Sequence, residues 1–185
     1  MEIRYRAHYP EIVELYRDLD RNIERIREAY REEGVRPACG EGCAACCSQL
    51  VVCTRTEALA AAEALRGKGF EESLSRWYAQ VKPLLAERPQ TEEEWEEFAQ
   101  AYRRLEAPCP FLREARCSIY PVRPVACRML YVQGDASPCA DPEGEIDQLG
   151  WFEEAATPAM DILLEESDAG IFPLLVANAL LSDEG

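Results

Sequence analysis

The spacing of apolar residues along the chain predicts mostly helices. Between Ile12 and Tyr30, apolar side chains recur every three or four residues with charged residues between them, which is typical of a helix with one buried face. Gly34 and Pro37 are expected to end this helix. The stripe is shorter than three heptads, so we expect it to pack on the protein's own core rather than form a coiled coil. It comprises Ile12, Tyr16, Leu19, Ile23, Ile26 and Tyr30.

Three further helices are predicted between residues 54 and 107. The first, over residues 54–69, begins with Thr54 and Glu57 in a capping-box pattern, and the third, over residues 91–107, repeats that pattern with Thr91 and Glu94. The second covers residues 70–89, and Pro83 should kink or interrupt its last turn. Aromatic and aliphatic residues recur at helical period in the last two segments, and we expect them in the core. They are Phe70, Leu74, Trp77, Tyr78, Val81, Leu85, Trp95, Phe98, Tyr102 and Leu105.

The helical period is lost between residue 109 and about residue 150, where prolines and glycines are frequent. Such a long irregular stretch is unusual in a compact domain unless something organises it, and a bound metal would do so. Residues 48–53 form a strand or buried coil, and two short helices are expected over residues 157–167 and 171–181. The predicted fold is mainly α, a single helical domain over residues 1–185 with a loop-rich, metal-organised cysteine segment.

Composition narrows the possible functions. A net charge of −15 disfavours nucleic-acid binding, which needs a basic surface. No apolar run is long enough for a membrane span, and the first residues lack the pattern of a secretory signal, so we expect a cytoplasmic protein without a membrane partner. Disulfides are rare in that compartment. The nine cysteines therefore indicate metal or redox chemistry.

Four cysteines are crowded into one short stretch, ACGEGCAACC, in a C-x3-C-x2-C-C arrangement. If this stretch were helical, the four side chains would lie within about a 100° arc. Thiolates held so close together repel one another unless a cation neutralises them, so the cluster favours a metal. A disulfide between the adjacent Cys46 and Cys47 would be strained. The cluster comprises Cys39, Cys43, Cys46 and Cys47.

A second set of cysteines is spread over the irregular segment and consists of Cys109, Cys117, Cys127 and Cys139. Its gaps are too uneven to match a zinc ribbon. Cys53 lies in an apolar run, and we expect it to be a buried core residue outside the site. His8 is the single histidine and is expected on the surface, so thiolates must supply most of the ligands.

These motifs resemble a known family. CGEGCAACC followed by CPFL, CSIY and RPVACR is similar to the YkgJ-like cysteine-cluster family, a zinc- or iron-chelating domain. The resemblance covers residues 39–128, which we expect to form a metal-binding core flanked by N- and C-terminal helices. It implies a metal-binding set of Cys39, Cys43, Cys46, Cys47, Cys109, Cys117 and Cys127, with Arg123, Pro124 and Arg128 in the same motif. Cys139 lies beyond the resemblance, and its proposed ligand role rests on its chemistry.

The residues leave the metal open, because thiolates suit both zinc and iron-sulfur clusters. Adjacent Cys46 and Cys47 cannot easily bind one zinc ion together, which favours more than one metal atom. We expect an iron-sulfur cluster or a multi-metal thiolate centre with a redox role. The alternative is a zinc-stabilised, four-cysteine interaction module without catalysis.

Arg123 and Arg128 are expected to bind the cofactor, by donating hydrogen bonds to its sulfurs or by offsetting its charge. No acid/base pair, phosphate loop or nucleophile motif is present to assign an enzymatic reaction. Metal ions are therefore the predicted partners, together with a small molecule or protein that the sequence does not identify.

Overall fold

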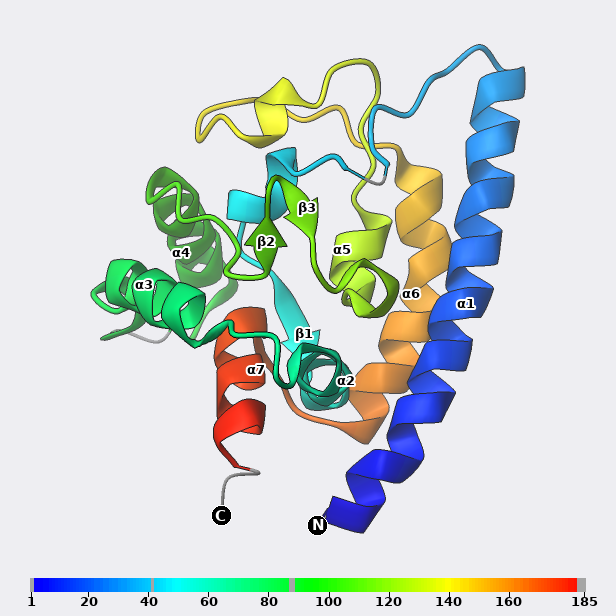
Figure 1. The fold of residues 1–185 in the computed structure, drawn as a ribbon. Coiled ribbons are helices and arrows are strands. Elements are labelled where there is room, and N and C mark those ends of the chain that lie inside the picture. The colour runs from blue at the N-terminus through cyan, green and yellow to red at the C-terminus, as the bar shows by residue number, and fades with distance from the viewer. Residues whose placement is uncertain (1, 41, 87–88, 183–185) are drawn as a thin grey trace.

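The fold was examined in a computed structural model, which describes residues 2–40, 42–86 and 89–182. Side chains are described from residue 11 onward, except that of residue 166. Helices account for most of the described chain, which forms a single helical domain with two small sheets (Figure 1). The predicted fold class is confirmed.

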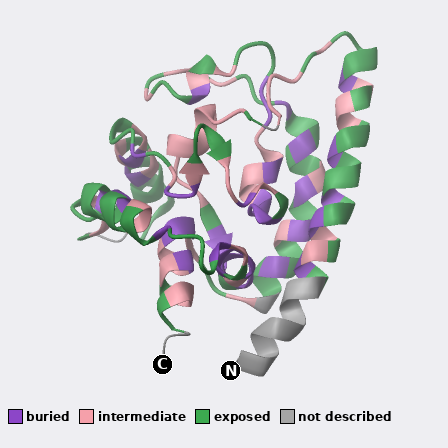
Figure 2. Ribbon diagram, viewed as in Figure 1, coloured by how far each residue is buried: buried purple, intermediate pink, exposed green. Residues whose placement is uncertain are grey.

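Two long helices run side by side along one edge of the molecule (Figure 1). They are α1 (Glu2–Glu32) and α6 (Gly150–Glu166), and α2 (Arg55–Leu65) packs against α1 as well. The predicted stripe of α1 is buried at Ile12, Tyr16, Leu19, Ile23 and Tyr30, while Ile26 is partly buried. In Figure 2 the buried positions of α1 and α6 face each other and the interior. The stripe packs on the protein's own core, as predicted.

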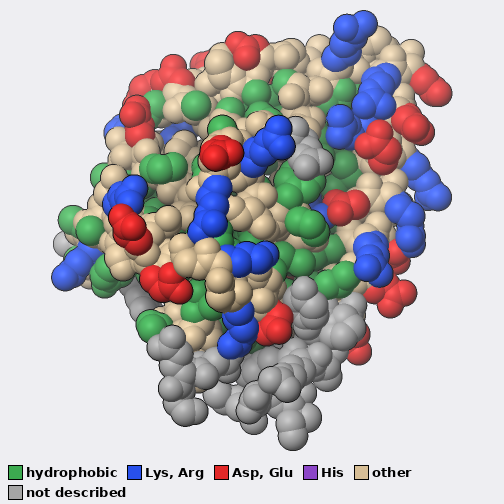
Figure 3. Space-filling view, viewed as in Figure 1, with side chains coloured by type: hydrophobic (Ala, Val, Ile, Leu, Met, Phe, Trp, Pro, Cys, Tyr) green, Lys and Arg blue, Asp and Glu red, His purple; other side chains and the backbone are tan. Residues whose placement is uncertain are grey.

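The outer face of α1 carries charges of both signs. In Figure 3, basic and acidic side chains alternate along this helix instead of forming one basic patch. Ion pairs there join Arg21 to Asp18, and both Arg27 and Arg31 to Glu24. None of the described helices combines the length and apolarity that a membrane crossing requires.

A short antiparallel sheet joins two distant parts of the chain. Strand β1 (Val52–Thr54) pairs with β4 (Ala169–Ile171), with Cys53 opposite Gly170. Helix α7 (Phe172–Leu181) follows β4 directly and packs against α2. Residues 48–53, expected as strand or coil, therefore lead into a strand that fixes the C-terminal helix against α2.

Helices α3 (Glu71–Val81) and α4 (Glu92–Arg104) form a smaller group to one side (Figure 1). Trp77 of α3 donates its indole N–H to the Tyr102 hydroxyl of α4 at 2.8 Å. The chain turns into η2 (Leu84–Ala86) just after Pro83, as predicted. Both predicted capping boxes are present, at Thr54 with Glu57 and at Thr91 with Glu94.

The prediction that the aromatic and aliphatic positions of these two stripes lie in the core is wrong at three of them. Trp95 and Leu105 are each 40% exposed and Tyr78 is 45% exposed, because α3 and α4 cover each other and leave their outer faces to solvent. Phe98 and Tyr102 are buried as expected.

The helix expected over residues 157–167 is longer than predicted. α6 begins at Gly150 and contains Pro158 in its interior. Proline has no backbone N–H, so Pro158 cannot donate to the Glu154 carbonyl, yet the helix continues past it to Glu166. The predicted C-terminal helix is present as α7, and its Phe172, Pro173 and Val176 are buried.

The cysteine segment between α4 and α6 is irregular, as predicted. It contains the hairpin of β2 (Leu112–Arg113) and β3 (Arg116–Cys117), the 3-10 turn η3 (Tyr120–Val122), the short helix α5 (Val125–Met129) and the turn η4 (Ser137–Cys139). η4 lies beside η1 (Ala45–Ser48), the turn that holds the first cysteine cluster.

Candidate metal centre

Backbone hydrogen bonds to distant residues hold both ends of the loop that carries the first cysteine cluster. Before it, the Ala38 N–H donates to the Val132 carbonyl at 2.8 Å. Gly42 has φ of +93°, a left-handed conformation that favours glycine, and it turns the chain between the first two cysteines. The last two cysteines sit in the 3-10 turn η1. The stretch is therefore a loop that ends in one tight turn, and not the helix that would place all four cysteine side chains within one arc.

Backbone hydrogen bonds bring the second cluster to the first. The Cys109 N–H donates to the Cys47 carbonyl at 2.7 Å, which joins the two segments directly. Cys117 ends the β2–β3 hairpin, and Cys127 lies in the short helix α5. Cysteines more than sixty positions apart in the sequence thus become neighbours in space.

Seven cysteines line one cavity of about 160 Å³, which we call the thiol cavity. They come from the first loop, the turn before the β2–β3 hairpin, the hairpin itself and α5, and each is partly accessible. Leu50, Val51, Ile119, Phe172 and Pro173 supply much of the apolar wall. The seven are Cys39, Cys43, Cys46, Cys47, Cys109, Cys117 and Cys127, the same set that the family resemblance implies.

The two remaining cysteines lie outside this cavity. Cys139 is buried and lines a neighbouring cavity of about 230 Å³ together with Asp135, Glu145 and Asp147. Its carbonyl accepts a hydrogen bond from the side chain of Gln49, a residue of the thiol cavity. Cys53 is only 1% exposed within the main core, as expected for a cysteine outside the site.

Burial and the proximity of other thiols raise the pKa values of five of the cavity cysteines. Burial raises the pKa of Cys39 to about 11 and that of Cys127 to about 12. The pKa of Cys46 is raised chiefly by a hydrogen bond with the neighbouring Cys47 side chain, and then by burial. Burial also raises the pKa values of Cys109 and Cys117. A metal ion must therefore displace protons in order to bind.

Arg123 is the one charged residue among the described residues that line the thiol cavity. It is 8% exposed, and its guanidinium stacks 3.7 Å from the centre of the Tyr120 ring. Its Nε atom has no hydrogen-bond partner among the described residues. Its positive charge favours the thiolate forms of Cys46, Cys117 and Cys127. A buried cation with an unused donor suits an anionic metal-thiolate group.

Arg128 has a different position from the one its motif suggests. Its guanidinium is fully buried, stacks 4.2 Å from the Tyr16 ring centre and bonds to Asp20. It also donates to the carbonyls of Arg123 at 2.9 Å and Pro121 at 2.8 Å. Arg128 therefore holds the turn that carries Arg123, and it is absent from the residues lining the cavity.

The donor set fits a thiophilic metal. Thiols dominate the cavity, and no carboxylate or imidazole is found among its described lining residues. In the present side-chain positions, however, the described residues contain no group of three cysteine, histidine or acidic side chains close enough together to hold a metal ion. The thiols surround the cavity, and binding would require their side chains to turn toward a common centre.

Several lining residues were not singled out as site residues from the sequence. Gln49, Tyr102, Tyr120 and Tyr131 reach the cavity from four different elements or loops. Tyr120 and Tyr131 flank the cysteine motifs, so their position in the sequence could have indicated that they lie near the site. Nothing in the sequence around Gln49 or Tyr102 indicates this. The side chain of His8 lies outside the described residues.

A family model matches the part of the chain that contains the cavity cysteines. No curated protein and no solved structure matches the chain significantly. A family model described as "CxxCxxCC: Putative zinc- or iron-chelating domain" matches residues 38–155. That range contains the seven cavity cysteines and Cys139, and it stops before Phe172 and Pro173 of the cavity wall. Because the match covers well over half of the 185 residues, the chain belongs to the CxxCxxCC family of zinc- or iron-chelating domains.

Proposed function

We propose that this metal-binding protein holds a polynuclear centre, an iron-sulfur cluster or a multi-metal thiolate group, with a redox role. The observation that carries the proposal is the gathering of seven thiols around one cavity. A single tetrahedral zinc ion needs four ligands at most from the protein. The number of thiols therefore supports more than one metal atom.

The size of the cavity supports the same conclusion. A cavity of about 160 Å³ is much larger than the roughly 10–15 Å³ that one water molecule requires. Space for a group of atoms remains once the thiol side chains turn inward. The adjacent Cys46 and Cys47, whose side chains contact each other, would serve different metal atoms or different corners of one cluster.

The residues in and around the cavity would have different roles in holding the centre. The seven cavity thiols supply ligands, and Cys139 joins the proposed set because its turn, η4, packs against η1, the turn that carries Cys46 and Cys47. Arg123 would donate to the sulfurs and offset their charge. Arg128 would act indirectly by fixing the turn that carries Arg123. When bound, an iron-sulfur group supplies reversible one-electron chemistry.

The test is purification under anaerobic conditions followed by analysis of iron, zinc and acid-labile sulfide. The proposal expects iron and sulfide in comparable amounts, with visible absorption that bleaches on reduction by dithionite. Stoichiometric zinc without sulfide, combined with a melting temperature that falls on chelation and no response to reductant, would instead establish the zinc-stabilised module.

A further inference from the structure

Four aromatic rings form a continuous stack through the protein. Trp151 stacks on Tyr30 with ring centres 4.5 Å apart, and Tyr30 stacks on Phe152 at 5.6 Å. Phe152 in turn stacks on Tyr131 at 3.9 Å. The three interplanar angles are 27°, 22° and 17°, so each ring overlaps the next nearly face to face.

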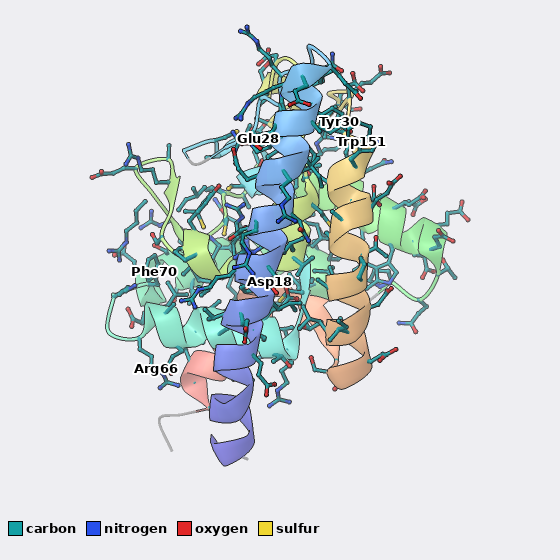
Figure 4. The ribbon with its side chains drawn as sticks, turned by 90° about the vertical axis from the view of Figure 1, so that its right-hand side faces the viewer. Asp18, Glu28, Tyr30, Arg66, Phe70 and Trp151 are labelled. Carbon is teal, nitrogen blue, oxygen red and sulfur yellow. The ribbon has the colours of Figure 1, made fainter. Side chains whose placement is uncertain are left out.

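The stack joins the thiol cavity to the surface. Tyr131 lines the cavity beside Arg123 and the thiols, and it is 3% exposed. At the other end, Trp151 is 40% exposed. Tyr30 and Phe152 between them are buried. Figure 4 shows Tyr30 and Trp151 together near the upper ends of α1 and α6.

Hydrogen bonds hold the rings in this order. The Trp151 backbone N–H donates to the Tyr30 hydroxyl at 3.4 Å, and the Leu149 N–H donates to the Tyr131 carbonyl at 2.8 Å. The long contact between α1 and α6 fixes the helices that carry three of the four rings. The geometry is therefore maintained by the fold rather than by one side-chain conformation.

We propose that this stack is the path by which an electron leaves the reduced metal centre for a one-electron acceptor docked at Trp151. Overlapping π systems couple a donor to an acceptor better than saturated side chains do. The inference rests on the proposed function, because it needs a redox-active centre. The centre loses one electron and the acceptor gains it. No bond is made or broken, no proton moves, and the rings return to their starting state.

The charge of the chain favours one kind of partner. At a net charge of −15, a basic redox protein with an exposed haem would approach most readily. Such a partner is too large to enter the cavity, and Trp151 offers it an exposed ring at the end of a stack that reaches the cavity wall at Tyr131. We identify the exposed face around Trp151 as the place where it docks.

The experiment measures electron transfer from the dithionite-reduced holoprotein to ferricytochrome c in an anaerobic stopped-flow instrument. We expect the rate to fall several-fold in Trp151→Leu and in Tyr30→Leu. Trp95→Leu is the matched control, because Trp95 is also 40% exposed and packs against Phe98, and among the described residues no ring contact joins this pair to the cavity. Its rate should equal that of the wild type.

Metal content, melting temperature and the reduction potential of the centre are measured for each variant. Equal rates in Trp151→Leu and Trp95→Leu would overturn the inference and leave the stack a packing feature. A slower rate accompanied by a shifted potential would also overturn it, since driving force would then explain the loss. If the wild-type protein holds no redox-active centre, the dithionite step shows this first, and the proposed function fails before any variant is compared.

Discussion

The Glu57 carboxylate accepts a hydrogen bond from the backbone N–H of Val125 at 2.7 Å, so the first turn of α2 is joined to the first residue of α5. The same oxygen accepts from the Tyr16 hydroxyl at 3.1 Å, and the other oxygen caps α2 through the N–H and hydroxyl of Thr54. Glu57 is fully buried. One carboxylate therefore fixes α1, α2 and the helix that carries Cys127 relative to one another.

Replacing Glu57 with alanine should destabilise the protein strongly. The change leaves buried donors without acceptors, and we expect the free energy of unfolding to fall by about 3 kcal/mol or more. Chemical denaturation followed by circular dichroism measures it. Glu63→Ala is the control, because Glu63 is an exposed residue on the same helix, and it should change stability by less than about 1 kcal/mol. Similar losses in both variants would contradict a special role for Glu57.

Cys47→Ser should lower the amount of metal bound per chain. Cys47 lines the cavity, and a hydroxyl is a poor substitute for a thiolate ligand of zinc or iron. Cys53→Ala provides the comparison, because Cys53 is buried in the core and is not among the residues that line the cavity. Its metal content should match that of the wild type. Elemental analysis of anaerobically purified protein measures the amount of metal bound per chain. An unchanged amount in Cys47→Ser would refute the ligand role of Cys47.

Substitution of the two arginines of the motif should have different effects, on metal affinity for Arg123 and on stability for Arg128. Arg123→Met removes the cation that faces the thiols, and we expect metal affinity to fall by about 10–100-fold with little loss of stability. Arg128→Met removes a fully buried group that bonds to two carbonyls and Asp20, so stability should fall by about 2–4 kcal/mol.

Competition with a chromophoric chelator measures the affinity of each arginine variant, and thermal unfolding measures its stability. A metal affinity in Arg123→Met that equals the wild-type value would show that this guanidinium does not act on the centre. An unfolding temperature in Arg128→Met equal to that of the wild type would contradict its structural assignment.

Metal binding should release protons and weaken as the pH falls. The pKa values of Cys39 and Cys127 are raised to about 11 and about 12, so both are protonated at neutral pH, and a metal must displace those protons. Lowering the pH favours the protonated form and therefore the metal-free protein. Adding Zn²⁺ to metal-free protein in a weak buffer with a pH indicator should release about one proton per coordinating thiol. Binding without acidification would contradict thiolate ligation.

Local sequence signals predicted most of the helices, although the start of α6 at Gly150 was missed. The capping boxes at Thr54 and Thr91 depend on residues three positions apart, and the stripe of α1 depends on a regular period, so both could be recognised without the fold. The irregular cysteine segment was equally clear, because prolines and glycines interrupt any period there.

Contacts between distant segments could not be predicted in the same way. The bond from Glu57 to Val125 joins residues 68 positions apart, and the pairing of Val52 with Ile171 involves strands too short to show alternation. The exposure of Trp95 depends on how α3 and α4 cover each other. The seven cysteines were identified through the family resemblance, but their arrangement around one cavity is a property of the fold.

The pairing of β1 with β4 also bears on the order of events during synthesis. It places Phe172 and Pro173 in the wall of the cavity, although the first cysteine cluster is made more than 120 residues earlier. The nascent chain therefore exposes all its thiols before the wall that encloses them has left the ribosome. A centre that is loaded into the complete cavity must therefore be inserted after Phe172 and Pro173 have joined its wall.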